Sequence, residues 1–173
     1  MKQLLILSAT AVLLASSPAY AAEQILPVPG EGWHIRLDAP PLTPAAVTFG
    51  SVYSGSAGRL QLSFFVSAPR CAGGDANEAI YHCYTAALKK SPLVVWETER
   101  GNTVPNGVQV MYMARLDTAQ AAGKSFNMHL LFARNGKWAD VHASIASPTK
   151  DDITLLAAVV NSIVIEDDAP AGK

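Results

Sequence analysis

Two histidines and an aspartate in the C-terminal third of the chain are the residues whose types and spacing could do chemistry. They flank Asn135-Gly136, the dipeptide most typical of a two-residue β-hairpin turn. Counting outward from that turn places His129 directly opposite His142, with Asp140 diagonal to His129 on the same face. Directly opposed side chains have Cβ atoms about 4.5–5.5 Å apart, so we expect the two imidazoles to lie in contact.

The same counting divides the predicted hairpin into two faces. One face is apolar and is expected in the core; it carries Phe126, Met128, Leu130 and Phe132 opposite Ile145, Ala143, Val141 and Ala139. The other face is mixed; it carries His129, His142 and Asp140 together with Asn127, Ser144 and Trp138. A shift of register by one residue would exchange the two faces, so this prediction depends on the turn.

Three interpretations of the mixed face stay open. Two imidazoles and a carboxylate are a common ligand set for zinc or copper, so His129, His142 and Asp140 could hold a metal ion or a small ligand. Because histidine titrates near neutral pH, the face could instead be a pH-sensitive interaction surface. The third interpretation is the polar face of an antiparallel sheet, partly covered by a helix and without specific chemistry.

Other patterns in the sequence give no support for catalysis. Ser147-x-x-Lys150 matches the S-x-x-K of penicillin-recognising enzymes, but their remaining motifs are absent, and Ser147 is better explained as a helix N-cap. Glu97 and Glu99 share one strand face, but no second acid–base element converges on them. The sequence holds no G-x-S-x-G, H-E-x-x-H, P-loop or dinucleotide fingerprint. We therefore expect no catalytic residues and no cofactor.

The N-terminus has the pattern of a secretory signal peptide. Met1-Lys2 forms a short basic region, residues 4–14 are apolar, and Ala19-Tyr20-Ala21 matches an A-x-A cleavage site. The apolar run is shorter than the ~20 residues that a membrane span needs. We expect cleavage after Ala21, a single globular domain over residues 22–165 and an acidic flexible tail over residues 166–173. The predicted location is the periplasm, with secretion as the neighbouring alternative.

Export decides how the two cysteines are interpreted. Cys71 and Cys83 are the only cysteines, and an even number in an oxidising compartment favours a disulfide. A redox pair usually has C-x-x-C spacing, which this pair lacks. A metal site would use His82 beside Cys83, but adjacent residues on a helix point in different directions. The sequence therefore predicts a structural disulfide.

Composition and charge exclude two classes of partner. The 173 residues are 50% hydrophobic and 16% charged, with a formal net charge of −1 and no basic block. A protein that binds nucleic acid would carry a basic patch, so that class is not expected. No apolar run after the leader approaches the length of a transmembrane helix, so we expect no membrane span once the leader is removed.

Apolar periodicity predicts an α+β fold with about seven antiparallel strands, a short terminal strand and two helices. The expected strands are 33–37, 47–53, 59–67, 93–100, 108–116, 126–134, 137–145 and 163–165. One helix is expected to start at an Asp75–Glu78 capping box, to turn Cys83 inward and to end before Pro92; the other is expected to start at Ser147-Pro148. Strands that are neighbours in sequence, with only two helices between them, favour an antiparallel sheet.

This order of elements, βββα-ββββ-α, resembles that of the PsbP-like fold group, which includes small bacterial envelope proteins. The residues that carry the resemblance are Gly32-Trp33, Asp38-Ala39-Pro40, Leu155-Leu156 and Asn161-Ser162-Ile163. The resemblance spans nearly the whole predicted mature chain. It implies a fold only, because the group shares no catalytic motif whose residues could be carried over.

Two functions remain open from the sequence. The first is a non-catalytic exported module that binds another envelope or secreted protein, such as an immunity or inhibitor protein against an envelope-targeting toxin, or an envelope accessory factor. Exposed aromatic and arginine side chains dominate such interfaces, which selects Tyr53, Arg70 and Trp138 as the interaction surface. The alternative is a periplasmic protein that binds a metal or small ligand through His129, His142 and Asp140.

Overall fold

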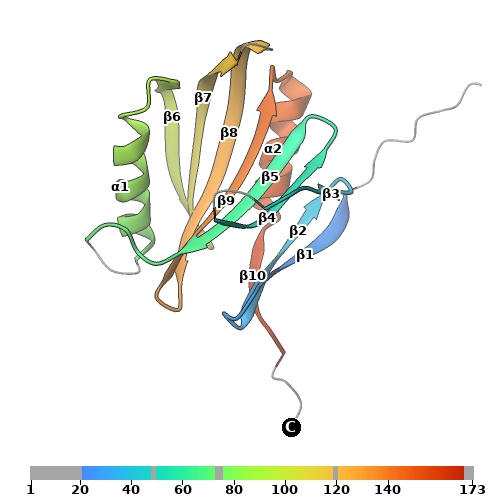
Figure 1. The fold of residues 1–173 in the computed structure, drawn as a ribbon, viewed down its shortest axis with the longest axis vertical. Coiled ribbons are helices and arrows are strands. Elements are labelled where there is room, and N and C mark those ends of the chain that lie inside the picture. The colour runs from blue at the N-terminus through green and yellow to red at the C-terminus, as the bar shows by residue number, and fades with distance from the viewer. Residues whose placement is uncertain (1–20, 48–49, 73–75, 119–120, 170–173) are drawn as a thin grey trace, which may run out of the picture.

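A large antiparallel sheet carries a helix on each face, and a smaller sheet completes the α+β fold (Figure 1). The structure, a computed structural model, describes residues 21–47, 50–72, 76–118 and 121–169. Its elements are β1 (Ala22–Val28), β2 (Trp33–Ala39), β3 (Thr43–Pro44), β4 (Ser51–Ala57), β5 (Leu60–Ser67), α1 (Asn77–Leu88), β6 (Val94–Val104), β7 (Gly107–Thr118), β8 (Ala121–Arg134), β9 (Lys137–Ala146), α2 (Lys150–Asn161) and β10 (Val164–Asp167). The large sheet has the order β3-β4-β5-β9-β8-β7-β6, and the small sheet has the order β1-β2-β10.

Two hydrophobic clusters lie on opposite faces of the large sheet. Alternate residues of β8 and β9 face α2 and the small sheet, where Trp33 packs edge-on to Phe132 with ring centroids 5.6 Å apart. The other face packs against α1 through a smaller cluster that includes Leu131 and Ile80. Leu130 and Leu131, adjacent in sequence, therefore belong to different cores. The apolar face predicted for the hairpin is confirmed.

The first strand of the small sheet was not expected from the sequence. β1 pairs with β2 along its whole length and buries Leu26 and Val28. Pro27 lies within it, and a proline argues against a strand in the middle of a sheet. β1 is an edge strand, where a missing N–H is tolerated.

The expected strand at 47–53 is wrong in its bounds, because β4 runs from Ser51 to Ala57. Ser54, Gly55 and Ser56, which lie beyond the expected end of the strand, are part of it. A Cβ at Gly55 would lie 2.4 Å from the hydroxyl oxygen of Tyr53, so glycine there makes room for the tyrosine ring. The turn itself falls at Gly58, which has a positive φ of 58°.

The prediction of a flexible tail from residue 166 is also corrected. Glu166 and Asp167, expected in a flexible tail, lie in β10 and form ion pairs with basic residues of β2 and β8. Glu166 Oε1 lies 2.8 Å from Arg36 Nη2, and Asp167 forms an ion pair with Arg134. The pairing with β2 and the ion pair with Arg36 hold the segment in the small sheet, and the ion pair with Arg134 joins it to the large sheet.

The N-terminal caps of both helices differ from expectation. α1 has Ala76 as its N-cap with no side-chain cap, and Asp75 of the predicted capping box lies outside the described residues. α2 begins at Lys150 with Thr149 as its N-cap. Ser147 cannot cap it, because its φ of 50° is left-handed and an N-cap residue is extended. No helix in the described parts of the chain is long and apolar enough to cross a membrane.

The capping box of α2 yields a first prediction. Thr149 Oγ1 accepts from the backbone N–H of Asp152 at 3.2 Å, and the Asp152 carboxylate accepts from the N–H of Thr149 at 2.7 Å. Thr149→Ala should lower the free energy of unfolding by about 1 kcal/mol, because the backbone N–H of Asp152 loses its side-chain acceptor. Ser147→Ala is the matched control. Urea unfolding in which the Ser147 variant loses as much as the Thr149 variant would contradict this assignment.

Candidate functional site

The hairpin register predicted from Asn135-Gly136 is confirmed. Both turn residues have positive φ, 51° and 73°, as the tight turn requires. His129 pairs with His142 across the two strands. Asp140 pairs with Leu131, which leaves its side chain beside His129.

The two imidazoles stack face to face. Their ring centroids lie 4.1 Å apart and their planes differ by 4°. The lone pairs of an imidazole lie in the plane of its ring, so two parallel stacked rings cannot direct them at one ion. No group of three or more His, Cys, Asp or Glu side chains in the described part of the chain is arranged to hold a metal. Metal binding stays a prediction without a ligand geometry.

His129 is the centre of a buried hydrogen-bond network beneath α1. It is 3% exposed, and its Nδ1 lies 2.8 Å from Asp140 Oδ1. A carboxylate only accepts, so Nδ1 carries a proton. The hydroxyls of Tyr84 and Tyr112 lie 2.8 Å and 3.3 Å from Nε2. Tyr84 belongs to α1, so the network joins the helix to the sheet.

The groups around His129 are held in their neutral forms. Burial raises the pKa of Tyr84 well above its usual range, and the charge of Asp140 raises it further. Burial likewise raises the pKa of Tyr112. His142 lies 3.0 Å from Asn127 Oδ1 through Nε2, and burial, followed by the neighbouring His129, lowers its pKa to about 3. The phenols therefore act as hydrogen-bonding groups, not as acids.

A cavity of about 320 Å³ lies between α1 and this face of the sheet. Its walls are Phe65, Ser67, Arg70, Ile80, Cys83, Tyr84, Ala87, Leu131, Trp138, Ala139 and Asp140. Two of the three residues proposed for an interaction surface, Arg70 and Trp138, thus meet in one cavity with Asp140. The third, Tyr53, lies on β4 and packs against the main core instead.

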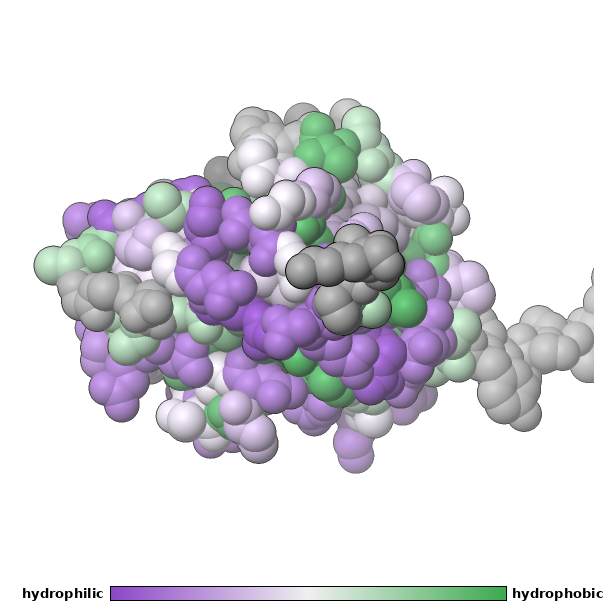
Figure 2. Space-filling view, turned by 90° about the horizontal axis from the view of Figure 1, so that it is seen from below, coloured by the Kyte–Doolittle hydropathy of each residue, from purple (hydrophilic) through white to green (hydrophobic). Residues whose placement is uncertain are grey.

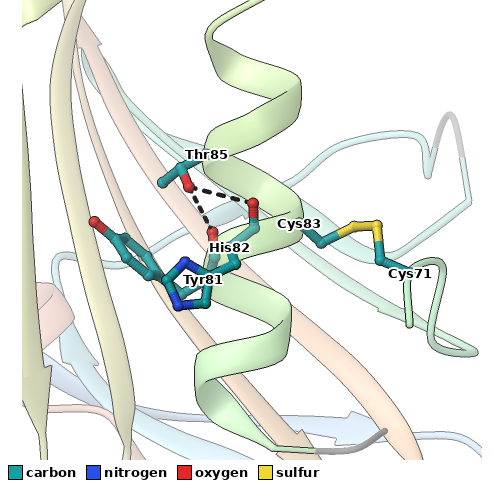
Figure 3. The surroundings of a disulfide bond; sticks show 5 residues. All are labelled: Cys71, Tyr81, His82, Cys83 and Thr85. Atoms are coloured by element: carbon teal, nitrogen blue, oxygen red, sulfur yellow. Dashed lines mark hydrogen bonds between the residues drawn. A yellow bond between two sulfur atoms is a disulfide. The ribbon is translucent and has the colours of Figure 1, made fainter. Parts of the chain in front are cut away.

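The predicted disulfide forms one wall of the cavity. Cys71 and Cys83 are bonded, with their Cα atoms 6.0 Å apart. Figure 3 shows Cys83 extending from α1 toward the segment that carries Cys71, while Tyr81 extends from a different side of the helix. Arg70 directly precedes Cys71, so the disulfide ties the residue with the cavity's positive charge to α1.

Charge in the cavity comes from two groups, Arg70 and Asp140. Arg70 makes no ion pair or hydrogen bond with a described residue. Asp140 binds His129 through Oδ1, and its side chain keeps 22% of its surface exposed. The rest of the lining is mostly apolar, as in typical small-molecule sites.

The remaining catalytic candidates from the sequence lie apart from the cavity. Glu99 accepts a hydrogen bond from the Tyr81 hydroxyl at 3.4 Å, on β6. The backbone N–H of Ser147 donates to the carbonyl of Lys124 at 2.8 Å, in the connection before α2. Sequence reasoning missed Tyr84 and Tyr112; the signal that could have found Tyr84 is its position four residues after Ile80, on the same face of α1.

No protein-family model matches this chain, and no curated protein matches it.

Removal of the disulfide should destabilise the protein. Closing a loop of this size restricts the unfolded chain, and the replacement of both Cys71 and Cys83 by alanine should cost about 3 kcal/mol of unfolding free energy. Urea unfolding of the double variant and of the wild type, each with and without a reductant, measures the loss. A reductant that leaves the wild-type curve unchanged would contradict the prediction.

His142 should make stability depend on pH. Its pKa of about 3 in the folded state is below the usual value near 6.5, so the unfolded chain binds more protons between these values. Unfolding free energy should therefore fall as pH drops from about 6.5 toward 3, by at most about 1.4 kcal/mol per pH unit from this group. The groups facing it are His129 on β8, Asp140 on β9 and Ser63 on β5.

The measurement is chemical unfolding of the wild type and His142→Gln across this pH range. The glutamine variant should show a shallower loss toward acid, because glutamine does not titrate. His82→Gln removes an exposed histidine of α1 and should follow the wild type. Parallel curves for the wild type and His142→Gln would show that His142 does not cause the acid sensitivity.

Proposed function

We propose that this protein is an exported, non-catalytic binding protein that holds a small ligand in the cavity under α1. The observation that carries the proposal is the cavity itself. Its volume of about 320 Å³ lies within the usual range for small-molecule sites, about 300–1,000 Å³. Phe65, Ile80, Leu131 and Trp138 offer an apolar surface to the body of such a ligand.

The charge at the cavity mouth indicates an acidic group on the ligand. Arg70 is exposed and has no partner among the described residues. A guanidinium presents several N–H donors in a planar fork that matches a carboxylate or sulfonate. A ligand with an apolar body and one acidic group therefore complements these walls.

The raised pKa of Tyr84, in the hydrogen-bond network around His129, favours binding over catalysis. Tyr84, His129 and Asp140 follow one another by hydrogen bonds, in the order of a nucleophile, base and orienting acid. A nucleophile needs a lowered pKa or an easily removed proton, whereas burial raises the pKa of Tyr84. These three hydrogen-bonded residues are therefore better suited to forming a fixed polar floor of the cavity.

Export remains part of the proposal. Residues 1–20 of the predicted leader, which runs to Ala21, lie outside the described residues, and β1 begins at Ala22, the first residue of the predicted mature chain. The disulfide supports an oxidising compartment, for which we propose the periplasm. The PsbP-like resemblance, proposed on the order of elements, is compatible with small envelope proteins of that fold.

Recognition of a protein partner, including an immunity or inhibitor role, has less support. Arg70 and Trp138 line a cavity, and Tyr53 lies elsewhere, so the three do not form one surface. On the face in Figure 2, hydrophilic side chains form a band across the molecule and hydrophobic ones are scattered. An interface would show apolar residues gathered in a patch.

The binding proposal predicts that the cavity takes an amphipathic anion. Anilinonaphthalene sulfonate, an aromatic sulfonate that fluoresces in apolar sites, should bind the native protein with about 1:1 stoichiometry. Ala87→Phe should weaken binding at least tenfold by filling the cavity, and Ala86→Phe, the same change on the neighbouring exposed residue of α1, is its control.

Arg70→Gln should also weaken binding of this probe, by about tenfold, because a charge-assisted hydrogen bond is lost. Arg115→Gln, at an exposed arginine of β7, is the matched control. Titration by fluorescence and by calorimetry measures both effects. Equal binding by Ala87→Phe and the wild type would place the probe elsewhere and refute the proposal.

A further inference from the structure

Two opposite charges line the cavity without neutralising each other. Arg70 and Asp140 both contribute to its walls, yet no ion pair joins them. Their separation therefore leaves a positive and a negative position in one cavity.

Asp140 keeps one oxygen available. Its Oδ1 accepts from His129 Nδ1 at 2.8 Å, whereas Oδ2 makes no hydrogen bond with a described residue. The hydrogen bond to His129 fixes the orientation of the carboxylate, so the free oxygen is held in place. An ammonium group donates up to three hydrogen bonds and suits such an acceptor.

From these positions we infer that the ligand is a small zwitterion with an apolar body, of the class of apolar α-amino acids. Its carboxylate pairs with Arg70, its ammonium donates to Asp140 Oδ2, and its side chain lies against Ile80, Leu131 and Trp138. This inference rests on the proposed function and specifies its ligand class.

The chemistry predicts strong discrimination between analogues. A ligand that lacks the ammonium leaves Oδ2 of Asp140 without a partner inside the cavity, and one that lacks the carboxylate leaves Arg70 without one. A site built for a polar group rejects the analogue that lacks it, because the unpaired protein group still loses water.

The test uses three probes of one shape: L-phenylalanine, phenylpropionate, which lacks the amine, and phenethylamine, which lacks the carboxylate. Isothermal titration of the wild-type protein at neutral pH should show phenylalanine binding at least tenfold more tightly than either analogue. This comparison needs no variant, so it holds even if a substitution at Asp140 disturbs the network around His129.

Two substitutions test which protein charge recognises which charged group of the ligand. Asp140→Asn should bring phenylalanine and phenylpropionate to equal affinity, and Arg70→Gln should do so for phenylalanine and phenethylamine. Asp38→Asn and Arg115→Gln, at exposed residues of β2 and β7, are the matched controls and should keep the wild-type preference.

The outcomes separate this inference from the proposed function. If anilinonaphthalene sulfonate binds in the cavity but phenylalanine does not bind more tightly than phenylpropionate, the zwitterion inference is overturned and the binding function stands. If neither the sulfonate nor any of the three probes binds, the proposed function falls and the inference falls with it.

Discussion

The register of one hairpin is the constraint on which the rest of this structure depends. Asn135 and Gly136 adopt the left-handed conformations of a two-residue turn, and this turn sets which residues of β8 and β9 face each other. Because strand side chains alternate, a slip by one residue would send Leu130 to the α1 side and His129 into the main core. Both clusters and the floor of the cavity follow from this register.

The mixed face then determines how α1 is held. Ile80 and Thr85 are the buried residues of this helix, and its other apolar side chains are only partly buried against the sheet. The hydrogen bonds that join Tyr84 to His129 and His129 to Asp140 supply a second attachment. A buried polar network is satisfied in few arrangements, so it fixes the position of the helix over the sheet more narrowly than hydrophobic contact would. The cavity keeps its shape for that reason.

The parts of this fold that the sequence could predict are those decided by near neighbours. The hairpin pairing needed only its turn and two alternating strands, and the disulfide needed only the cysteine count and the compartment. β10 was missed as a strand over Glu166 and Asp167 because its partners, Arg36 and Arg134, are distant in sequence. The cavity was missed for the same reason: it exists only where α1 and the segment before it meet the sheet.

The disulfide also makes the rim of the cavity depend on the oxidation state of the two cysteines. Cys83 is a wall of the cavity, and its bond to Cys71 holds the adjacent Arg70 at the rim. While the thiols are reduced, the segment that carries Arg70 has no covalent tether to α1. In the proposed function, oxidation of the two thiols is therefore the step that fixes the arginine at the cavity rim.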